Sequence, residues 1–279
     1  MYASCGTENY DEGLGTVYER FMLNHYFERL MDSYVIRNCL EVPIYGMTGL
    51  TGINSVYLAK KGCNLMLVDT KKENILEAEK LWKSIPVKGG YDTLLHEDLS
   101  KLPFINNSFD LVWNFAALWH VKDAALLLNE MARVSSNLVL IFVPNKKQPG
   151  YPLRKYVLDS NFFTTIDESW IDLNRITKQL KLQGMRVIDE GLIDIPFWPD
   201  TAVPIKRLFK KRDVNEEKSD KGMSKGFWRW DIMSYYRGNN PQLKDKIEKF
   251  SFLEKRSIPR QLKTLWAHHL YGLYSKNCQ

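Results

Sequence analysis

Along most of the chain, short apolar runs alternate with segments whose apolar positions recur at helical spacing. Ile75, Ala78 and Leu81, for example, are three apart, which places them on one face of a helix. Strands that alternate with helices build a parallel sheet covered by helices on both faces. The pattern therefore predicts a doubly wound α/β fold. The apolar runs that predict strands are residues 36–42, 65–68, 91–96, 110–115, 137–143, 185–195 and 267–275.

The same pattern divides the chain into three parts. Residues 1–35 include apolar positions at helical spacing from 15 to 34, so we expect a helical segment before the first strand. Residues 36–200 and 263–279 together carry the alternating strands and helices of the core. Residues 201–262 show no such alternation, which predicts an insertion between the last two strands.

The insertion separates Ile195 from Ala267 by 72 positions. A connection of that length in a compact domain is usually functional or disordered. The aromatic group at 227–236 is costly to leave in water, so we expect an inserted cap that binds the substrate. Basic residues before this group either attract an anionic substrate or form a solvated face; they are Lys206, Arg207, Lys210, Lys211 and Arg212.

The most informative stretch is EVPIYGMTGLTGINSVYLAKKGCNLMLVD, residues 41–69, which is typical of a strand, a glycine loop, a helix and a second strand. Gly46, Gly49 and Gly52 let the backbone turn tightly and approach a ligand closely. Asp69 follows Gly52 by 17 residues, and an acid at such a strand tip accepts the hydroxyls of a ribose in nucleotide-binding folds. An ordinary βαβ unit with a glycine turn is the alternative.

Composition narrows the class of protein. The chain has 279 residues and a net charge of +6, too mild to indicate a nucleic-acid partner. No apolar run approaches the roughly 18 residues of a membrane span, and the N-terminus lacks the pattern of a secretory signal. The four cysteines lie far apart, which argues against a zinc site or disulfide framework and fits free thiols in the cytoplasm; they are Cys5, Cys39, Cys63 and Cys278.

Through its strands, glycine loop and the block that follows the third strand, the sequence resembles the class I S-adenosylmethionine-dependent methyltransferases. The most specific block is LPFINNSFDLVWNFAALWHVKDAALLLNEMARVSSNLVLIFVPN, residues 102–145, and the resemblance covers about 36–195 plus the last strand. It implies a mostly parallel, Rossmann-like sheet of seven strands with an antiparallel last strand. It also implies S-adenosylmethionine as the cofactor.

The resemblance assigns the cofactor contacts residue by residue. Asp69 would bind the ribose, and Asp98 with Leu99 would flank the adenine. The glycine loop would lie against the methionine part of the cofactor. The acid before this loop would be Glu41, although the loop to Gly52 is then longer than the family's usual acid-x-Gly-x-Gly-x-Gly pattern. Aligning backward from Gly52 instead places Gly46 at the acid position, so the contacts of this loop depend on the alignment.

The resemblance also places residues beside the substrate. Asn114 and Phe115 would face the methyl group, and His120 matches a histidine common after that strand in small-molecule methyltransferases. A catalytic His120 would take a proton from the substrate nucleophile; a core or capping role is the alternative. His268 and His269 fall in a predicted strand, so we expect their rings on opposite faces and no metal site.

We therefore predict a methyltransferase that acts on a small molecule or metabolite. One alternative is an NAD(P)-dependent oxidoreductase, whose loop would more often read Gly-x-Gly-x-x-Gly. Another is a binding protein that keeps the fold without transferring methyl groups, because the first loop departs from the usual pattern. The absence of an Asn/Asp-Pro-Pro-Tyr run after the fourth strand argues against amino methylation of nucleic-acid bases.

Overall fold

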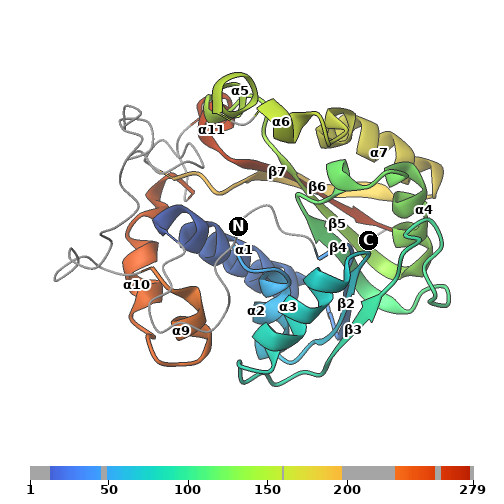
Figure 1. Ribbon diagram of the computed structural model, residues 1–279, viewed down its shortest axis with the longest axis horizontal. Coiled ribbons are helices and arrows are strands. Elements are labelled where there is room, and N and C mark those ends of the chain that lie inside the picture. The colour runs from blue at the N-terminus through green and yellow to red at the C-terminus, as the bar shows by residue number, and fades with distance from the viewer. Residues whose placement is uncertain (1–12, 45–48, 159, 197–229, 255–258, 277–279) are drawn as a thin grey trace, which may run out of the picture.

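A seven-stranded sheet forms the centre of the molecule (Figure 1). The computed structural model describes residues 13–44, 49–158, 160–196, 230–254 and 259–276. The strand order is β3-β2-β1-β4-β5-β7-β6, and β7 alone runs antiparallel to its neighbours β5 and β6. The predicted doubly wound fold is thereby confirmed. The strands are β1 Asn38–Glu41, β2 Asn64–Asp69, β3 Tyr91–Leu95, β4 Phe109–Phe115, β5 Ser135–Pro144, β6 Arg186–Ile193 and β7 His269–Ser275.

Helices cover both faces of this sheet because successive strand residues point to opposite sides. In β4, Leu111 and Trp113 pack into one hydrophobic cluster, whereas Val112 packs into the other. The first cluster is covered by α1 Leu14–Ser33, α2 Val56–Lys60 and α3 Lys72–Trp82. The second is covered by α4 Ala124–Val134 and α7 Leu173–Leu182.

Short helical turns complete the connections. Before α2 the chain makes the 3-10 turn η1 Ile53–Ser55, and after β4 it makes η2 Leu118–His120. The link from β5 to α7 contains four pieces, α5 Gly150–Leu153, η3 Arg154–Leu158, α6 Ser160–Phe163 and η4 Glu168–Ile171. Among the helices that the structure describes, none has both the length and the apolar character needed to cross a bilayer.

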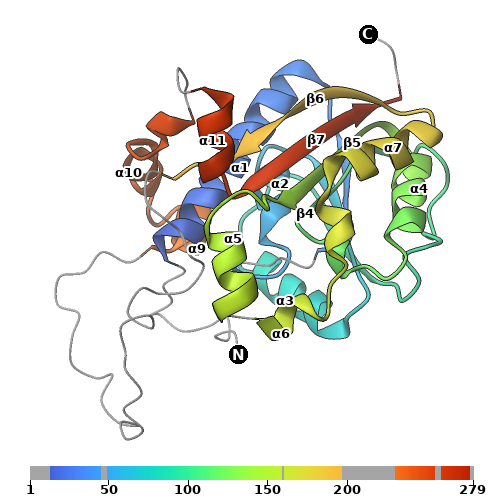
Figure 2. The same cartoon turned by 90° about the horizontal axis from the view of Figure 1, so that it is seen from above.

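The described part of the insertion packs against α1. Its helices are α9 Ile232–Tyr236, α10 Leu243–Glu248, η5 Ser251–Leu253 and α11 Arg260–Trp266. The rings of Phe21 and Tyr235 lie 4.8 Å apart, and the Tyr236 hydroxyl donates a hydrogen bond of 3.0 Å to Asn24 Oδ1. Figures 1 and 2 show α9 and α10 beside α1. The predicted basic cluster at 206–212 lies outside the described residues, so the cap and the three-part division stay predictions.

Candidate functional site

A pocket of about 520 Å³ opens at the edge of the sheet where β2, β3 and β4 end. The ends of these strands and the segments after them supply most of its wall, and Pro43, Phe162 and Thr165 supply the rest. Ligand pockets fall in this size range, and ligands of parallel sheets bind beyond the carboxyl ends of the strands. The pocket brings together four of the predicted site residues: Asp69, Asp98, Leu99 and His120.

Asp69 presents one carboxylate oxygen without a hydrogen-bond partner among the described residues. Its Oδ1 accepts bonds from the Lys71 backbone N–H at 2.9 Å and from Asn74 Nδ2 at 3.0 Å. Its Oδ2 is buried and accepts none, although the residue lines the pocket. Burial raises the pKa of Asp69 even though these bonds favour the charged form. The carboxylate is thus fixed in orientation and has one acceptor left for a ligand hydroxyl.

Asp98 and Leu99 lie on the loop after β3, where one is exposed and the other buried. Asp98 Oδ1 accepts hydrogen bonds from the backbone N–H and the hydroxyl of Ser100. The hydroxyl bond chiefly lowers the pKa of Asp98. Leu99 lines the pocket with an apolar side chain. Asp98 is therefore an ionised turn residue at the pocket rim.

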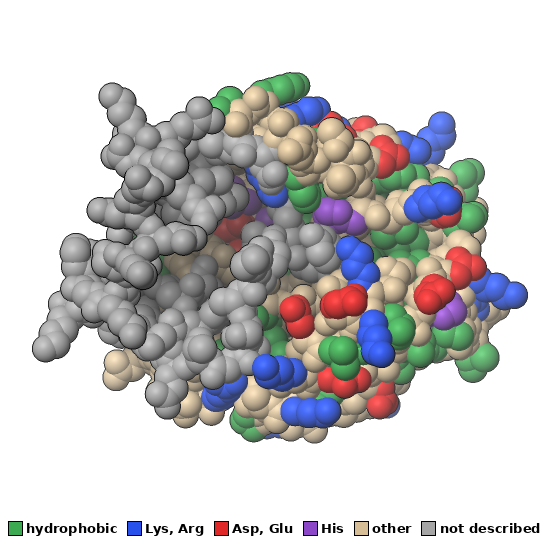
Figure 3. Space-filling model, viewed as in Figure 1, with side chains coloured by type: hydrophobic (Ala, Val, Ile, Leu, Met, Phe, Trp, Pro, Cys, Tyr) green, Lys and Arg blue, Asp and Glu red, His purple; other side chains and the backbone are tan. Residues whose placement is uncertain are grey.

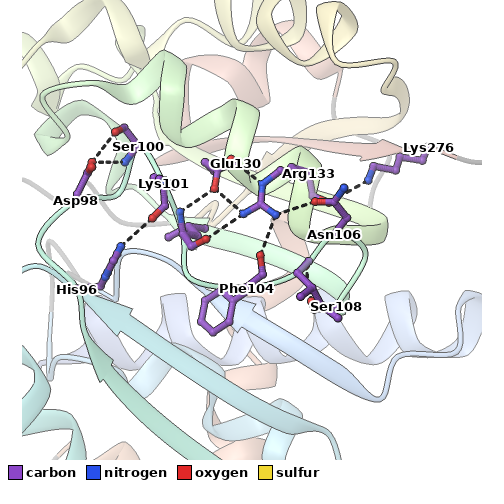
Figure 4. A network of polar contacts seen from close by, with 12 residues as sticks. His96, Asp98, Ser100, Lys101, Phe104, Asn106, Ser108, Glu130, Arg133 and Lys276 are labelled. Atoms are coloured by element: carbon purple, nitrogen blue, oxygen red, sulfur yellow. Dashed lines mark hydrogen bonds and ion pairs between the residues drawn. The ribbon is translucent and has the colours of Figure 1, made fainter.

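Arg133 on α4 holds the loop that follows Leu99, a role that the sequence pattern did not indicate (Figure 4). Its guanidinium donates to Glu130, to the carbonyls of Leu102 and Phe104, and to Asn106. Glu130 in turn accepts the Leu102 backbone N–H at 2.7 Å. These charge-assisted bonds, all 2.7–3.0 Å long, fix the loop that carries Asp98 against α4.

His120 closes the pocket from the side of β4. It ends η2, and its ring packs edge-on against Trp119 and Phe162, with centroids 5.6 and 5.5 Å away. Burial, together with the charges of Lys71 and Arg154, lowers its pKa to about 4. The imidazole is therefore neutral at physiological pH, so it has a nitrogen that accepts a proton, but it is a weak base.

Glu41 lies behind the glycine loop, and it is not one of the described residues that line the pocket. Its carboxylate, 1% exposed, accepts hydrogen bonds from Ser55 Oγ at 2.6 Å and Asn54 Nδ2 at 3.4 Å. Burial raises the pKa of Glu41 to about 7. These bonds tie the end of β1 to η1, so the residue supports the loop from inside.

Two of the three glycines of the loop lie within the described residues. Gly46 lies within 45–48, outside the described residues, whereas Gly49 and Gly52 both have positive φ angles, 77° and 75°. A Cβ at Gly52 would lie 2.8 Å from the Cβ of Ala78 on α3. The Gly52 carbonyl also accepts a 2.9 Å bond from Trp82 Nε1. Gly52 thus allows the loop to pack closely on α3.

Asn114 and Phe115 point to opposite faces of the sheet, as successive strand residues do. Asn114 Nδ2 donates to the Val42 carbonyl at 3.3 Å. The Phe115 ring packs against Phe142 and His269, with centroids 5.1 and 4.7 Å away. Their place beside a methyl group stays a prediction.

The expectation that His268 and His269 point apart is wrong. Their Nδ1 atoms lie 3.0 and 3.7 Å from the same oxygen, Oδ2 of Asp194. β7 begins only at His269, so His268 is outside the regular alternation of the strand. Burial alone would raise the pKa of Asp194, but the two histidines hold it below its ordinary value.

That cluster extends to α1, where Glu19 Oε2 lies 3.7 Å from His269 Nδ1 and Arg20 pairs with Glu19 Oε1 at 2.9 Å. The described groups thus converge from α1, from the end of β6 and from the start of β7. Nothing in the sequence indicated this convergence, because its members are about 175 and 250 positions apart.

Comparison with known proteins identifies the fold of the chain. The sequence profile of a family described as a methyltransferase domain matches residues 47–141. No curated protein matches the chain by sequence. A magnesium protoporphyrin IX methyltransferase from Synechocystis PCC 6803 with bound SAH is similar in structure, with a TM-score of 0.50 and 16% identity. The alignment covers 68% of this chain and 84% of that one.

A second solved structure, of the MccD protein, aligns with a TM-score of 0.52 and 14% identity over 91% of this chain and 96% of that one. Structural matches at identities this low show the fold alone, and the methyltransferase domain that the family profile matches indicates the activity. Together they give the chain a methyltransferase domain on the class I fold, with S-adenosylmethionine as methyl donor.

Proposed function

We propose that this methyltransferase binds S-adenosylmethionine in the pocket at the ends of β2, β3 and β4 and methylates a small molecule there. The observation that carries the proposal is the buried Oδ2 of Asp69, an acceptor without a partner among the described residues, on a residue that lines the pocket. A buried carboxylate oxygen without a bond is costly, and a ribose hydroxyl would satisfy it. The residues present therefore fit the cofactor.

The other pocket residues have complementary roles in this proposal. Leu99 offers an apolar contact to the adenine, and Asp98 accepts a polar group at the rim. When bound, the sulfonium supplies an activated methyl group for one in-line displacement. The chain then contributes mainly by holding donor and acceptor in line, since positioning provides a large share of the rate in such reactions.

His120 is the proposed proton acceptor. Its neutral imidazole lines the pocket, so it can take the proton that an O–H or N–H nucleophile loses. A pKa of about 4 suits a nucleophile that gives up its proton readily. Substrates that need a strong base are expected to react poorly.

The surface charges of the described residues support a small-molecule substrate, and their free thiols support a cytoplasmic location. Basic and acidic side chains are interspersed on the described part of the face in Figure 3, as expected for a solvated surface rather than a nucleic-acid track. Cys39 and Cys63 are free thiols, which favours a reducing compartment. An anionic substrate, with residues 201–262 as its cap, completes the proposal but depends on basic residues outside the described part.

The test combines binding with turnover. Calorimetric titration should show binding of S-adenosylmethionine and none of NAD⁺. Incubation with methyl-labelled S-adenosylmethionine and a metabolite extract should then label a small molecule. His120→Ala should slow that transfer about 100-fold, the low end for loss of a general base, with the cofactor Kd nearly unchanged.

Two outcomes would contradict this proposal. Binding of S-adenosylmethionine without transfer to any extract fraction would favour a non-catalytic binding protein. An unchanged rate in His120→Ala would make His120 structural. The control variant is His96→Ala: the His96 ring lies outside this pocket, and its Nε2 donates a hydrogen bond of 2.9 Å to the Lys101 carbonyl.

A further inference from the structure

Three side chains with metal-binding atoms meet under the N-terminal half of α1. Glu19 Oε2 and Asp194 Oδ2 each lie 3.7 Å from Nδ1 of His269. The side chains are 5%, 2% and 4% exposed. They come from α1, from the residue just after β6 and from the first residue of β7. Figures 1 and 2 show α1 beside the β6–β7 hairpin.

One ring nitrogen of His269, Nδ1, lacks the hydrogen bond that burial demands. This atom is fully buried, and no described group hydrogen-bonds to it. Both facing carboxylate oxygens, at 3.7 Å, are too distant to accept a proton from it. A buried polar atom without a partner normally marks strain, a functional role or an unseen ion or water.

The distances suit one ion between the three atoms. Ligand atoms about 2.1 Å from a tetrahedral metal lie about 3.4 Å from each other. The three atoms here all lie within 4.8 Å of one another, with both distances to His269 at 3.7 Å. A side-chain shift of a few tenths of an ångström brings the imidazole and either carboxylate to that spacing.

The charges of the cluster also favour a cation. Arg20 pairs with Oε1 of Glu19, and Oε2 of the same carboxylate lies 3.7 Å from His269 Nδ1. The cluster thus holds two buried carboxylates, of which Glu19 is paired with this guanidinium and Asp194 lies beside the two histidines. Buried charges are normally paired or coordinate a metal. His268 Nδ1, 3.0 Å from Asp194 Oδ2, orients that carboxylate as a supporting residue.

We propose that Glu19, Asp194 and His269 bind one divalent transition-metal ion, of the Zn²⁺ or Mn²⁺ class. One imidazole and two carboxylates are a ligand set suited to such ions and poorly suited to soft monovalent ones. Three protein ligands leave coordination positions open. The His269 ring contacts Phe115, the last residue of β4, so the ion would lie at the same edge of the sheet as the pocket. The proposal does not depend on the cofactor assignment.

The experiment measures metal binding directly. The full chain is treated with EDTA, freed of chelator and titrated with ZnCl₂ and, separately, MnCl₂ by calorimetry, with bound metal counted by elemental analysis. We expect one equivalent of at least one of the two ions and a Tm that rises with its concentration. His269→Ala should weaken binding by at least the 10- to 100-fold that loss of a supporting residue costs.

His25→Ala is the matched control. His25 also lies near two carboxylates, Glu28 and Glu248, at 3.9 and 3.5 Å, but its side chain is 33% exposed. It should bind the ion as the wild type does. If His269→Ala does not fold by circular dichroism, Glu19→Gln replaces it, because its amide keeps the shape and removes the anionic ligand.

Several results would overturn the site. The wild type binding neither ion at one equivalent would do so without any variant. Unchanged affinity in a folded His269→Ala or Glu19→Gln protein would move the ion elsewhere. Equal losses in His25→Ala and His269→Ala would indicate surface binding only.

Discussion

Two carboxylates at the same edge of the sheet have opposite surroundings. Oδ1 of Asp69 accepts hydrogen bonds from Lys71 and Asn74, which are close in sequence, and the buried Oδ2 has no hydrogen-bond partner among the described residues. Asp194 is surrounded by the side chains of His268 and His269, more than 70 positions away. The first acid is oriented by neighbours two and five positions along the chain, and the second is held in its charged form by two histidines from a distant element.

The difference predicts that mutations in the two regions change different measured quantities. A carboxylate with an unused oxygen at a pocket contributes to ligand binding and little to the fold. A carboxylate buried among charges of both signs, even one that can bind an ion, also contributes strongly to the fold, because removing one member leaves another charge buried without compensation. The open region is therefore expected to respond to mutation in affinity, and the closed region in the free energy of unfolding.

Arg20→Leu is expected to have the largest effect. Arg20 is 1% exposed and compensates Glu19, so its loss should lower the free energy of unfolding by about 3–5 kcal/mol. Urea denaturation in EDTA measures this. Arg29→Leu, an exposed change on the same helix, should stay within about 0.5 kcal/mol. Equal stability of both variants would remove the distinction between the two regions.

Asp69→Asn should lower cofactor affinity next most strongly. The amide keeps the acceptor for Lys71 and Asn74 but replaces the second carboxylate oxygen with a donor. Loss of hydrogen bonds to a charged acceptor costs about 1.5–3 kcal/mol, or roughly 10- to 150-fold in the Kd for S-adenosylmethionine. Its stability should change far less than that of Arg20→Leu. A large loss of stability with normal affinity would assign Asp69 to the fold instead.

The third-largest effect is expected in the pH dependence of stability, and it comes from Glu41. Its folded pKa of about 7 lies above the ordinary value of 4.5, so the folded state binds the proton more tightly. Stability is therefore full below pH 4.5 and is lost as the pH rises through 7, by up to about 2 kcal/mol between pH 5.5 and 7.5. Glu41→Gln should remove this part of the slope. The exposed Glu73→Gln should leave the slope unchanged, and an identical slope in Glu41→Gln would contradict the assignment.

Asp98→Ala should have the smallest effect. The carboxylate is exposed and already bonded to Ser100, and the clamp at Arg133 keeps the loop in place. We expect a loss of only about two- to tenfold in cofactor affinity. If calorimetry instead shows a loss as large as in Asp69→Asn, Asp98 carries the main polar contact of the pocket.

The pocket residues were largely predictable because they depend on local order along the chain. Apolar runs fix the strands, and the carboxyl ends of parallel strands share one edge of the sheet, so Asp69 and Asp98 had to approach each other. Asn74 and Lys71, five and two positions after Asp69, were near enough in sequence to suspect as its partners. The clamp by Arg133 was not, since its partners lie up to 31 positions away.

By itself, the sequence determined the order of strands and helices, the antiparallel last strand expected from the family resemblance, and the acid at the tip of β2. Only the tertiary structure decided that Glu19, Asp194 and His269 meet, and that the helices α9 and α10 pack on α1. The physical reason is the distance along the chain over which each effect acts. Periodicity and turn chemistry act over a few residues, whereas the meeting of α1 with the β6–β7 hairpin depends on how whole elements pack around the core.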